Sequence, residues 1–153
     1  MRTHRLGPLA LLVFALPALG GCGKLRPVEG VVTLDGAPLP AATIIFHAVK
    51  SPENQAGGLR EASAMTDKDG KFRLETRSKK GALEGSYKIT VSRRVLPPGV
   101  KPPENVLEAM AVETKKVETV PAPYLSIDTT TLLVEVPKGG RKDVEIQLET
   151  ISR

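Results

Sequence analysis

The sequence predicts an all-β protein, a seven-stranded antiparallel β-sandwich. About seven short segments alternate apolar with polar side chains, and turn-forming residues separate them. The chain contains 13 Pro and 14 Gly, which work against long helices. Its 153 residues suffice for one domain with a core but hardly for two. A small open barrel is the alternative fold, whereas the absence of any long internal repeat excludes a propeller or solenoid.

The first 21 residues resemble a secretory signal peptide. Arg2, His4 and Arg5 precede an uncharged apolar run over residues 6–19, and two glycines follow it. The run is shorter than the roughly 20 residues that a membrane-spanning helix needs, and it contains Pro8 and Pro17. We therefore expect residues 1–21 to direct export and then to be removed.

The end of this signal resembles the bacterial lipobox. Leu19, Gly20 and Gly21 come directly before Cys22, which is the only cysteine of the chain. Small residues let an extended backbone enter a peptidase site, and the cysteine thiolate takes a thioether-linked diacylglycerol. We expect Cys22 to be lipidated and residues 22–27 to tether the domain to the membrane; the alternative is an ordinary cleavage site. Gly23 in place of Asp favours the outer membrane by the rule of enteric bacteria, but which membrane holds the lipid stays open.

The first strands of the domain follow the tether. Residues 28–34 are β-branched and end at Asp35 and Gly36, a strong hairpin signal. Residues 42–49 alternate, with Phe46 on one face and His47 on the other. Residues 50–60 contain proline, asparagine and glycine and are expected to form a surface loop.

The next strands flank a second turn. Residues 61–66 and 71–76 are expected to pair as a hairpin around Asp67, Asp69 and Gly70. After a basic loop, Tyr87 begins another alternating strand.

The last third of the domain starts with a proline-rich stretch over residues 97–121. Pro103 and Glu104 suit the first turn of a short helix near 103–113, with Val106, Leu107 and Met110 on one side. Two final alternating strands, 132–136 and 144–148, are joined by the turn 138–141.

Three segments resemble the carboxypeptidase regulatory-like domains. Residues 28–47 resemble the opening pattern v-x-G-x-V-x-x-d-G-x-P of that family, residues 66–74 resemble its T-D-x-x-G-x-F segment, and residues 85–91 resemble G-x-Y-x-v-x-v. The tail, from Pro121 through residues 129–136, further resembles a group of small planctomycete-type lipoproteins. Ala42, where the family often has Gly-Ala, and the longer 50–61 loop depart from the pattern.

The resemblance implies a transthyretin-like (prealbumin-like) sandwich over residues 28–150. It also implies a non-catalytic role, as an accessory or adhesion-like module of extracytoplasmic proteins. The related hydroxyisourate hydrolases use several His and Arg residues and a Tyr-Arg-Gly-Ser terminus. This chain ends with Glu149-Thr-Ile-Ser-Arg153 instead. We therefore expect no enzyme and no cofactor.

The candidate chemistry of the chain is sparse. His47 is the only histidine after residue 21, and its strand position favours packing over general-base catalysis. Asp67 and Asp69 suggest calcium, but Met65 stands where an EF-hand-type loop needs an oxygen ligand, and Thr76 stands where it needs a glutamate. Asp35, Gly36, Asp67, Asp69 and Gly70 are thus expected to be structural turn residues, with no metal site.

The charge balance initially suggests an acidic partner. The whole chain has a formal charge of +5, but removing residues 1–21 takes away Arg2 and Arg5 and leaves 20 basic and 17 acidic residues. The remaining basic residues are expected to be scattered over loops as a solvated surface, with weak contact to anionic lipid headgroups or polysaccharide as the alternative. Nucleic acid is not an expected partner.

These patterns predict a non-catalytic, lipid-anchored module of the cell envelope with a structural or protein-interaction role. Its expected partners are the membrane, reached through the lipid, and an envelope protein or polysaccharide. The alternative is a carbohydrate- or peptide-binding module that uses the loops 50–60 and 97–121.

Overall fold

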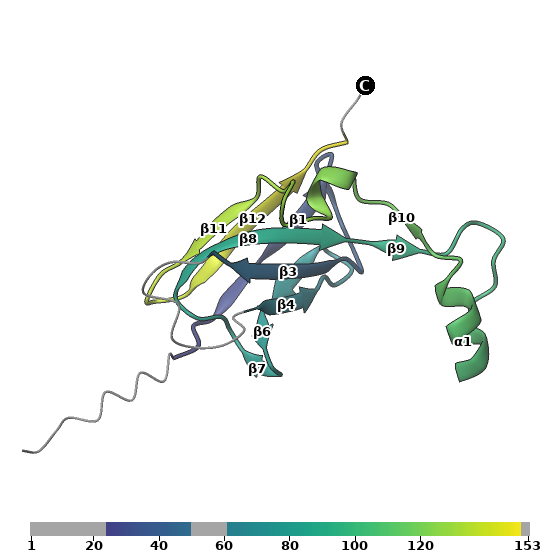
Figure 1. Cartoon of the computed structure of the whole chain (residues 1–153), viewed down its shortest axis with the longest axis horizontal. Helices are drawn as coiled ribbons and strands as arrows, with labels where there is room; N and C mark the ends of the chain where they lie inside the picture. The colour runs from purple at the N-terminus through teal and green to yellow at the C-terminus, as the bar shows by residue number, and fades with distance from the viewer. Residues whose placement is uncertain (1–23, 50–60, 151–153) are drawn as a thin grey trace, which may run out of the picture.

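The computed structural model describes residues 24–49 and 61–150, and these form an all-β fold with one short α-helix (Figure 1). Two principal sheets and a small two-stranded ladder contain the strands. Their bounds are β1 (Val28–Leu34), β2 (Ala37–Pro38), β3 (Thr43–Ala48), β4 (Ala62–Met65), β5 (Lys71–Arg73), β6 (Glu75–Thr76), β7 (Lys79–Lys80), β8 (Gly85–Ser92), β9 (Arg94–Val95), β10 (Val117–Glu118), β11 (Leu133–Val136) and β12 (Arg141–Leu148). The predicted all-β class is confirmed, and nearly all strand pairs are antiparallel.

One pair departs from the predicted antiparallel arrangement. β1 lies at the centre of the first sheet, between β12 on one side and β2 and β5 on the other, and it pairs with β12 in parallel. Val28 is opposite Arg141 and Leu34 is opposite Leu148, so both strands begin at the same end of the sheet. A parallel pair needs a long crossover connection, and here the whole second sheet lies between the two strands in the sequence.

The second sheet is antiparallel and has the order β11-β8-β3-β4-β6-β7. Its long central pair joins β3 to β8, with Ile44 opposite Val91 and Phe46 opposite Ile89. The predicted alternation on β3 is observed, because Ile44 and Phe46 are fully buried while His47 on the other face is partly exposed.

The predicted hairpin of 61–66 with 71–76 is only half correct. Residues 71–76 divide at Leu74, which is buried, into β5 and β6. β6 pairs with β4 as predicted, but β5 pairs with β1 in the other sheet. The segment therefore changes sheets at Leu74, which is how strands form a corner between packed sheets.

Side chains from both sheets share one core. The ring of Phe46 on β3 lies 6.2 Å from that of Phe72 on β5 and 5.8 Å from that of Tyr87 on β8, both in tilted orientations. Val32 and Ile146 contribute from the first sheet, and both are buried. Aromatic side chains bury large apolar areas, so this cluster joins the two sheets.

The predicted helix is observed as α1 (Val106–Glu113), beginning three residues after Pro103. Asn105 caps it, since its Oδ1 accepts a hydrogen bond from the Glu108 N–H at 2.9 Å. The Glu108 carboxylate in turn accepts from the N–H of Glu104 at 3.0 Å. This arrangement resembles a capping box, which satisfies N–H groups that have no partner within the helix.

Candidate functional site

The predicted lipidation site lies outside the described residues. The site consists of Cys22 and of Leu19, Gly20 and Gly21 of the lipobox. The signal segment 1–21 and the predicted loop 50–60 also lie outside the described residues. The described chain contacts the rest of the fold at once: Arg26 exchanges backbone hydrogen bonds with Ala82, and Pro27 accepts one from the N–H of Arg141. The strand that follows the expected tether is thus fixed from its first residue.

The predicted turn at Asp35 and Gly36 joins β1 to β2 as a two-residue hairpin. Both residues have positive φ, 51° and 80°, which is the conformation of a type I′ turn. Asp35 has a second role, because its carboxylate accepts hydrogen bonds from Thr150 Oγ1 at 2.5 Å and from the Thr150 N–H at 2.7 Å. These two bonds, the hydroxyl first, lower the pKa of Asp35.

The predicted turn from Asp67 to Gly70 is a structural one. Asp67 Oδ1 accepts hydrogen bonds from the N–H groups of Asp69 and Lys71, both at 2.9 Å. Gly70 has a φ of +72° and approaches the backbone of β1 closely. Asp69 contributes its N–H to the turn, and no hydrogen bond of its carboxylate is observed within the described residues. The described residues also contain no group of three or more potential metal ligands.

His47 joins two side chains on the outer face of the second sheet. Its Nε2 is 2.9 Å from Thr90 Oγ1 and its Nδ1 is 3.2 Å from Glu61 Oε1. Hydroxyl, imidazole and carboxylate have the order of a hydrolase triad, which sequence reasoning did not predict. Thr90, however, is only 9% exposed on a strand with neighbours on both sides, so a substrate has no open approach to its hydroxyl. The contacts connect β3, β8 and the segment before β4.

The proline-rich stretch forms an arm that leaves the second sheet beyond β8. The arm consists of residues 94–118, namely β9, the following loop, α1 and β10, and Figure 1 shows α1 at its far end, away from both principal sheets. β9 and β10 pair with each other, with Val95 opposite Val117. The small ladder therefore serves as the stalk of the arm.

Glu118 fixes the root of the arm. Its carboxylate accepts hydrogen bonds from Ser92 Oγ at 2.6 Å and from the N–H groups of Arg93, Val120 and Thr119 at 2.8, 2.9 and 3.0 Å. Partial burial alone would raise the pKa of Glu118, but these four bonds, that from Ser92 first, outweigh it and lower the pKa. No sequence pattern singled out this carboxylate, because its donors come from two distant segments.

α1 displays apolar side chains to solvent. Val106 and Leu107 are each 79% exposed and Met110 is 69% exposed, and no residue of the helix is buried. The helix is held through its last turn instead, where the Glu113 carboxylate contacts Lys116 Nζ at 2.6 Å and Arg94 Nη1 at 3.5 Å. A helix in a compact fold normally buries its apolar side, whereas α1 presents Val106, Leu107 and Met110 to solvent.

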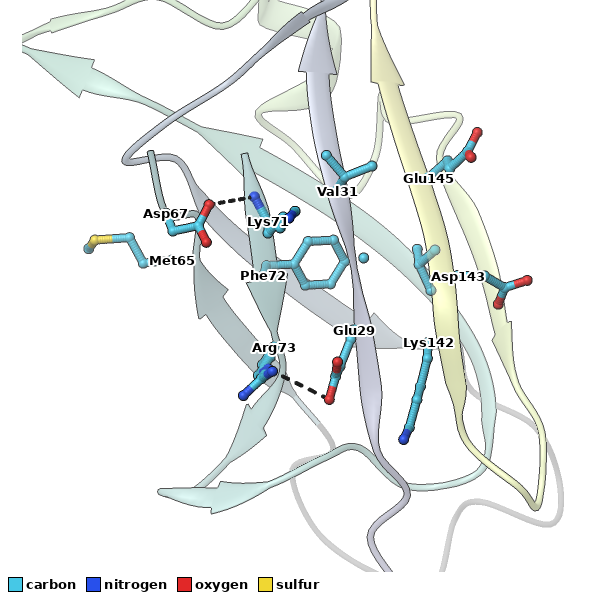
Figure 2. A pocket seen from close by; sticks show the side chains of 12 residues that line it. Glu29, Val31, Met65, Asp67, Lys71, Phe72, Arg73, Lys142, Asp143 and Glu145 are labelled. Atoms are coloured by element: carbon cyan, nitrogen blue, oxygen red, sulfur yellow. Dashed lines mark hydrogen bonds and ion pairs between the residues drawn. The ribbon is translucent and has the colours of Figure 1, made fainter. Parts of the chain in front are cut away.

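An open hollow of about 620 Å³ lies over the first sheet (Figure 2). Phe72 lies across its floor, and its rim has both charges, including an ion pair of Arg73 with Glu29 at 3.6 Å and the side chains of Lys142 and Asp143. Phe72 is only 3% exposed, so it offers no stacking face to a sugar ring.

The aromatic side chains after residue 21 offer little surface for sugar stacking, because three are buried and Tyr124 is partly buried. Phe46, Phe72 and Tyr87 are buried, and Tyr124 packs against the core.

Among the described residues, no helix is long and apolar enough to cross a membrane. Comparisons with protein-family models, curated proteins and solved structures returned no match to this chain. Its function must therefore be argued from its own residues.

Proposed function

We propose that this protein is a non-catalytic, lipid-anchored module of the cell envelope, an extracytoplasmic β-sandwich of the carboxypeptidase regulatory-like, transthyretin-like type. In this proposal residues 1–21 direct export, Cys22 is acylated, and the domain from Val28 onward acts in structure or protein interaction. The observation that carries the interaction role is the exposure of Val106, Leu107 and Met110 at the end of a fixed arm.

The anchor is supported by the sequence Leu19-Gly20-Gly21-Cys22 directly after an apolar segment of signal-peptide length. Two or more acyl chains on one residue give stable membrane attachment, since each buried methylene contributes about 0.8 kcal/mol. With only five residues between Cys22 and Val28, such a domain lies close to the membrane.

The interaction role is supported by how the arm is built. Four hydrogen bonds to Glu118 fix its root, and Glu113 connects the helix to Arg94 on β9 of the stalk. The apolar side chains are thus displayed from a defined position rather than from a free tail. Such a surface suits a partner protein with an apolar patch, because burying these side chains removes apolar area from water.

The alternative, a carbohydrate- or peptide-binding module, keeps support only for peptides. The 50–60 loop lies outside the described residues, while the 97–121 loop contributes exposed aliphatic rather than aromatic side chains. Aliphatic side chains suit an apolar peptide segment better than a sugar.

Metabolic labelling with an alkynyl fatty acid tests the anchor. Wild-type protein is compared with the Cys22→Ala variant, and we expect label in the first and none in the second. Equal labelling of both, or no label in the wild type, contradicts the anchor.

Photo-crosslinking in intact envelopes tests the arm. A photoreactive residue replaces Leu107 on α1 or, as the matched control, Leu133 on β11, which is 65% exposed. We expect a discrete protein adduct from position 107 that Met110→Glu abolishes, and none from position 133. Identical products from both positions contradict a specific contact at α1.

A further inference from the structure

We infer that the end of the domain where β1 begins is a binding surface for anionic lipid headgroups, which rests on the membrane beside the acylated Cys22. The inference rests on the proposed function, because the lipid anchor brings this end to the bilayer. It deepens that function by assigning a second membrane contact to the folded domain.

Three segments that are far apart in the sequence meet at this end. Arg26 and Ala82 form a β-bridge, with N–H to oxygen contacts of 2.7 and 2.9 Å, which places the β7 hairpin beside the N-terminal segment. On the other side, the N–H of Arg141 donates to Pro27 at 2.8 Å. In Figure 1 the turn before β12 lies at the left edge, the start of β1 at the lower left and β7 at the bottom, all away from the end of β12. We call these segments, 24–27, 77–82 and 137–142, the basic end.

The basic end concentrates positive charge. Its three segments contain eight of the 20 basic residues that follow residue 21 and none of the 17 acidic ones, so the remainder of that sequence has an excess of acids. The basic members are Lys24, Arg26, Arg77, Lys79, Lys80, Lys138, Arg141 and Lys142. Two basic clusters that are far apart in the sequence, 77–80 and 138–142, therefore lie at the same end of the fold. The parallel pairing of β1 with β12 is the main cause, because it puts the start of β12 beside the start of β1.

These side chains are available to a ligand. Seven of the eight residues are exposed, and Arg26 is partly buried. Only Arg141 has an ion pair among the described residues, a 3.5 Å contact with Asp143, which is itself largely exposed. Arg77 and Ser78 form the two-residue loop between β6 and β7 with φ of 49° and 63°, so a tight type I′ turn presents Arg77, Lys79 and Lys80 from a rigid hairpin.

The opposite end of the first sheet has mainly acidic side chains. Asp35 and Glu149 follow the last residues of β1 and β12, and the 67–70 turn contributes Asp67 and Asp69 around Lys68. The domain is thus polarised, with its positive end next to the expected anchor. A negative membrane surface favours this orientation and disfavours the reverse.

The tether is short enough to keep the basic end near the bilayer. Five residues separate Cys22 from Val28, and the six Cα–Cα steps limit their Cα separation to roughly 20 Å. The hydrogen bonds of Arg26 and Pro27 fix the last part of this segment. Electrostatic attraction acts within a Debye length of about 8 Å at physiological ionic strength. The length of the tether permits the basic end to lie within that distance of the membrane. Among possible polyanions, lipid headgroups are the ones that the anchor brings next to the basic end. We therefore propose lipid headgroups, rather than an acidic polysaccharide, as the ligand.

Vesicle sedimentation of an unacylated chain tests this surface separately from the anchor. The protein is residues 22–153 with Cys22→Ser, which keeps every buried core residue of the described fold, from Val28 to Leu148. The vesicles contain either equal parts of phosphatidylglycerol and phosphatidylcholine or phosphatidylcholine alone. The test variant is Lys79→Gln, Lys80→Gln, Lys142→Gln. The matched control, with the same loss of charge, is Lys68→Gln, Lys101→Gln, Lys115→Gln, and all six lysines are exposed.

We expect the unmodified lysines to support binding to the anionic vesicles that weakens as salt is raised. The test variant should lose at least about tenfold in partitioning, while the control stays within about twofold of the parent. The inference would be overturned if both variants lost partitioning equally or if the parent protein showed no preference for anionic vesicles. Binding to soluble alginate but not to vesicles would also overturn it. If Cys22 is labelled in cells and the vesicle result is negative, the proposed function stands and this surface does not.

Discussion

Arg26 and Ala82 exchange two backbone hydrogen bonds, although 55 intervening residues separate them in the sequence. This bridge attaches the N-terminal segment to the β7 hairpin before β1 begins. With the bond from Arg141 to Pro27, it makes the end nearest to the expected anchor a fixed part of the fold. The described chain is therefore attached to the fold from Arg26 onward, two residues before β1 begins.

Gly70 and Gly36 provide a matched test of the two turns. Both have positive φ, but a Cβ at Gly70 would lie 2.5 Å from the Val32 carbonyl oxygen, whereas one at Gly36 would meet nothing within 4 Å. We expect Gly36→Ala to cost about 1 kcal/mol from backbone strain and Gly70→Ala about 3 kcal/mol from strain and overlap. Urea unfolding measures both, and equal costs would contradict the close approach to β1.

The turn at Arg77 and Ser78 is strained because neither residue is glycine. Ser78→Gly should stabilise the protein by about 1 kcal/mol, since glycine adopts positive φ without a steric penalty. Ser86→Gly, on the exposed face of β8, is the control and should destabilise by about 0.5–1 kcal/mol. Thermal unfolding separates the two signs, and a destabilised Ser78→Gly protein would argue against the type I′ turn.

Glu118 should make the arm sensitive to acid. Because its folded-state pKa lies below the ordinary 4.5, its contribution to stability is present above that value and disappears as the pH falls through the lowered pKa. At neutral pH, Glu118→Gln should cost about 1 kcal/mol, a figure that allows for solvent screening. Hydrogen exchange should then be faster at the Arg93 and Val120 amides.

Glu135→Gln is the control for that change, because Glu135 is an exposed residue on β11. Its exchange pattern should match that of the wild type. If both substitutions accelerate the same amides, the bonds to Glu118 do not fix the root of the arm.

Thr150 should control the ionisation of Asp35. Its hydroxyl makes the largest contribution to the lowered pKa of Asp35, so Thr150→Ala should raise that pKa toward the ordinary 3.8. The shift should be partial, because the Thr150 N–H continues to donate. A carboxyl-detected NMR titration measures it, and an unchanged pKa would contradict the contact.

The faces of the strands were predictable from sequence. Alternation identified Phe46, Phe72 and Tyr87 as core residues. The turn-forming Asp and Gly residues identified Asp35-Gly36 and the 67–70 segment as turns. The signal for the helix start was present too, in Asn105 followed three residues later by Glu108, but Pro103 drew the predicted start too early. These are local features, which depend on a few neighbouring residues.

The pairing of strands was not predictable in the same way. Alternation says which side of a strand is buried but not which strand lies beside it. This is why the parallel neighbour of β1 and the change of sheet at Leu74 were missed, and why Arg77 and Arg141 seemed unrelated. The bonds from Ser92 and Arg93 to Glu118 and the contacts of His47 are likewise non-local, so no spacing in the sequence indicates them.

The central claim is that the mature chain begins at an acylated Cys22. Intact-mass measurement of the protein purified from membranes, followed by sequencing of its N-terminal peptide, tests this most directly. We expect a chain that begins at Cys22 with the added mass of a diacylglyceryl group. A chain that begins at another residue, or that has a free thiol at Cys22, would contradict it.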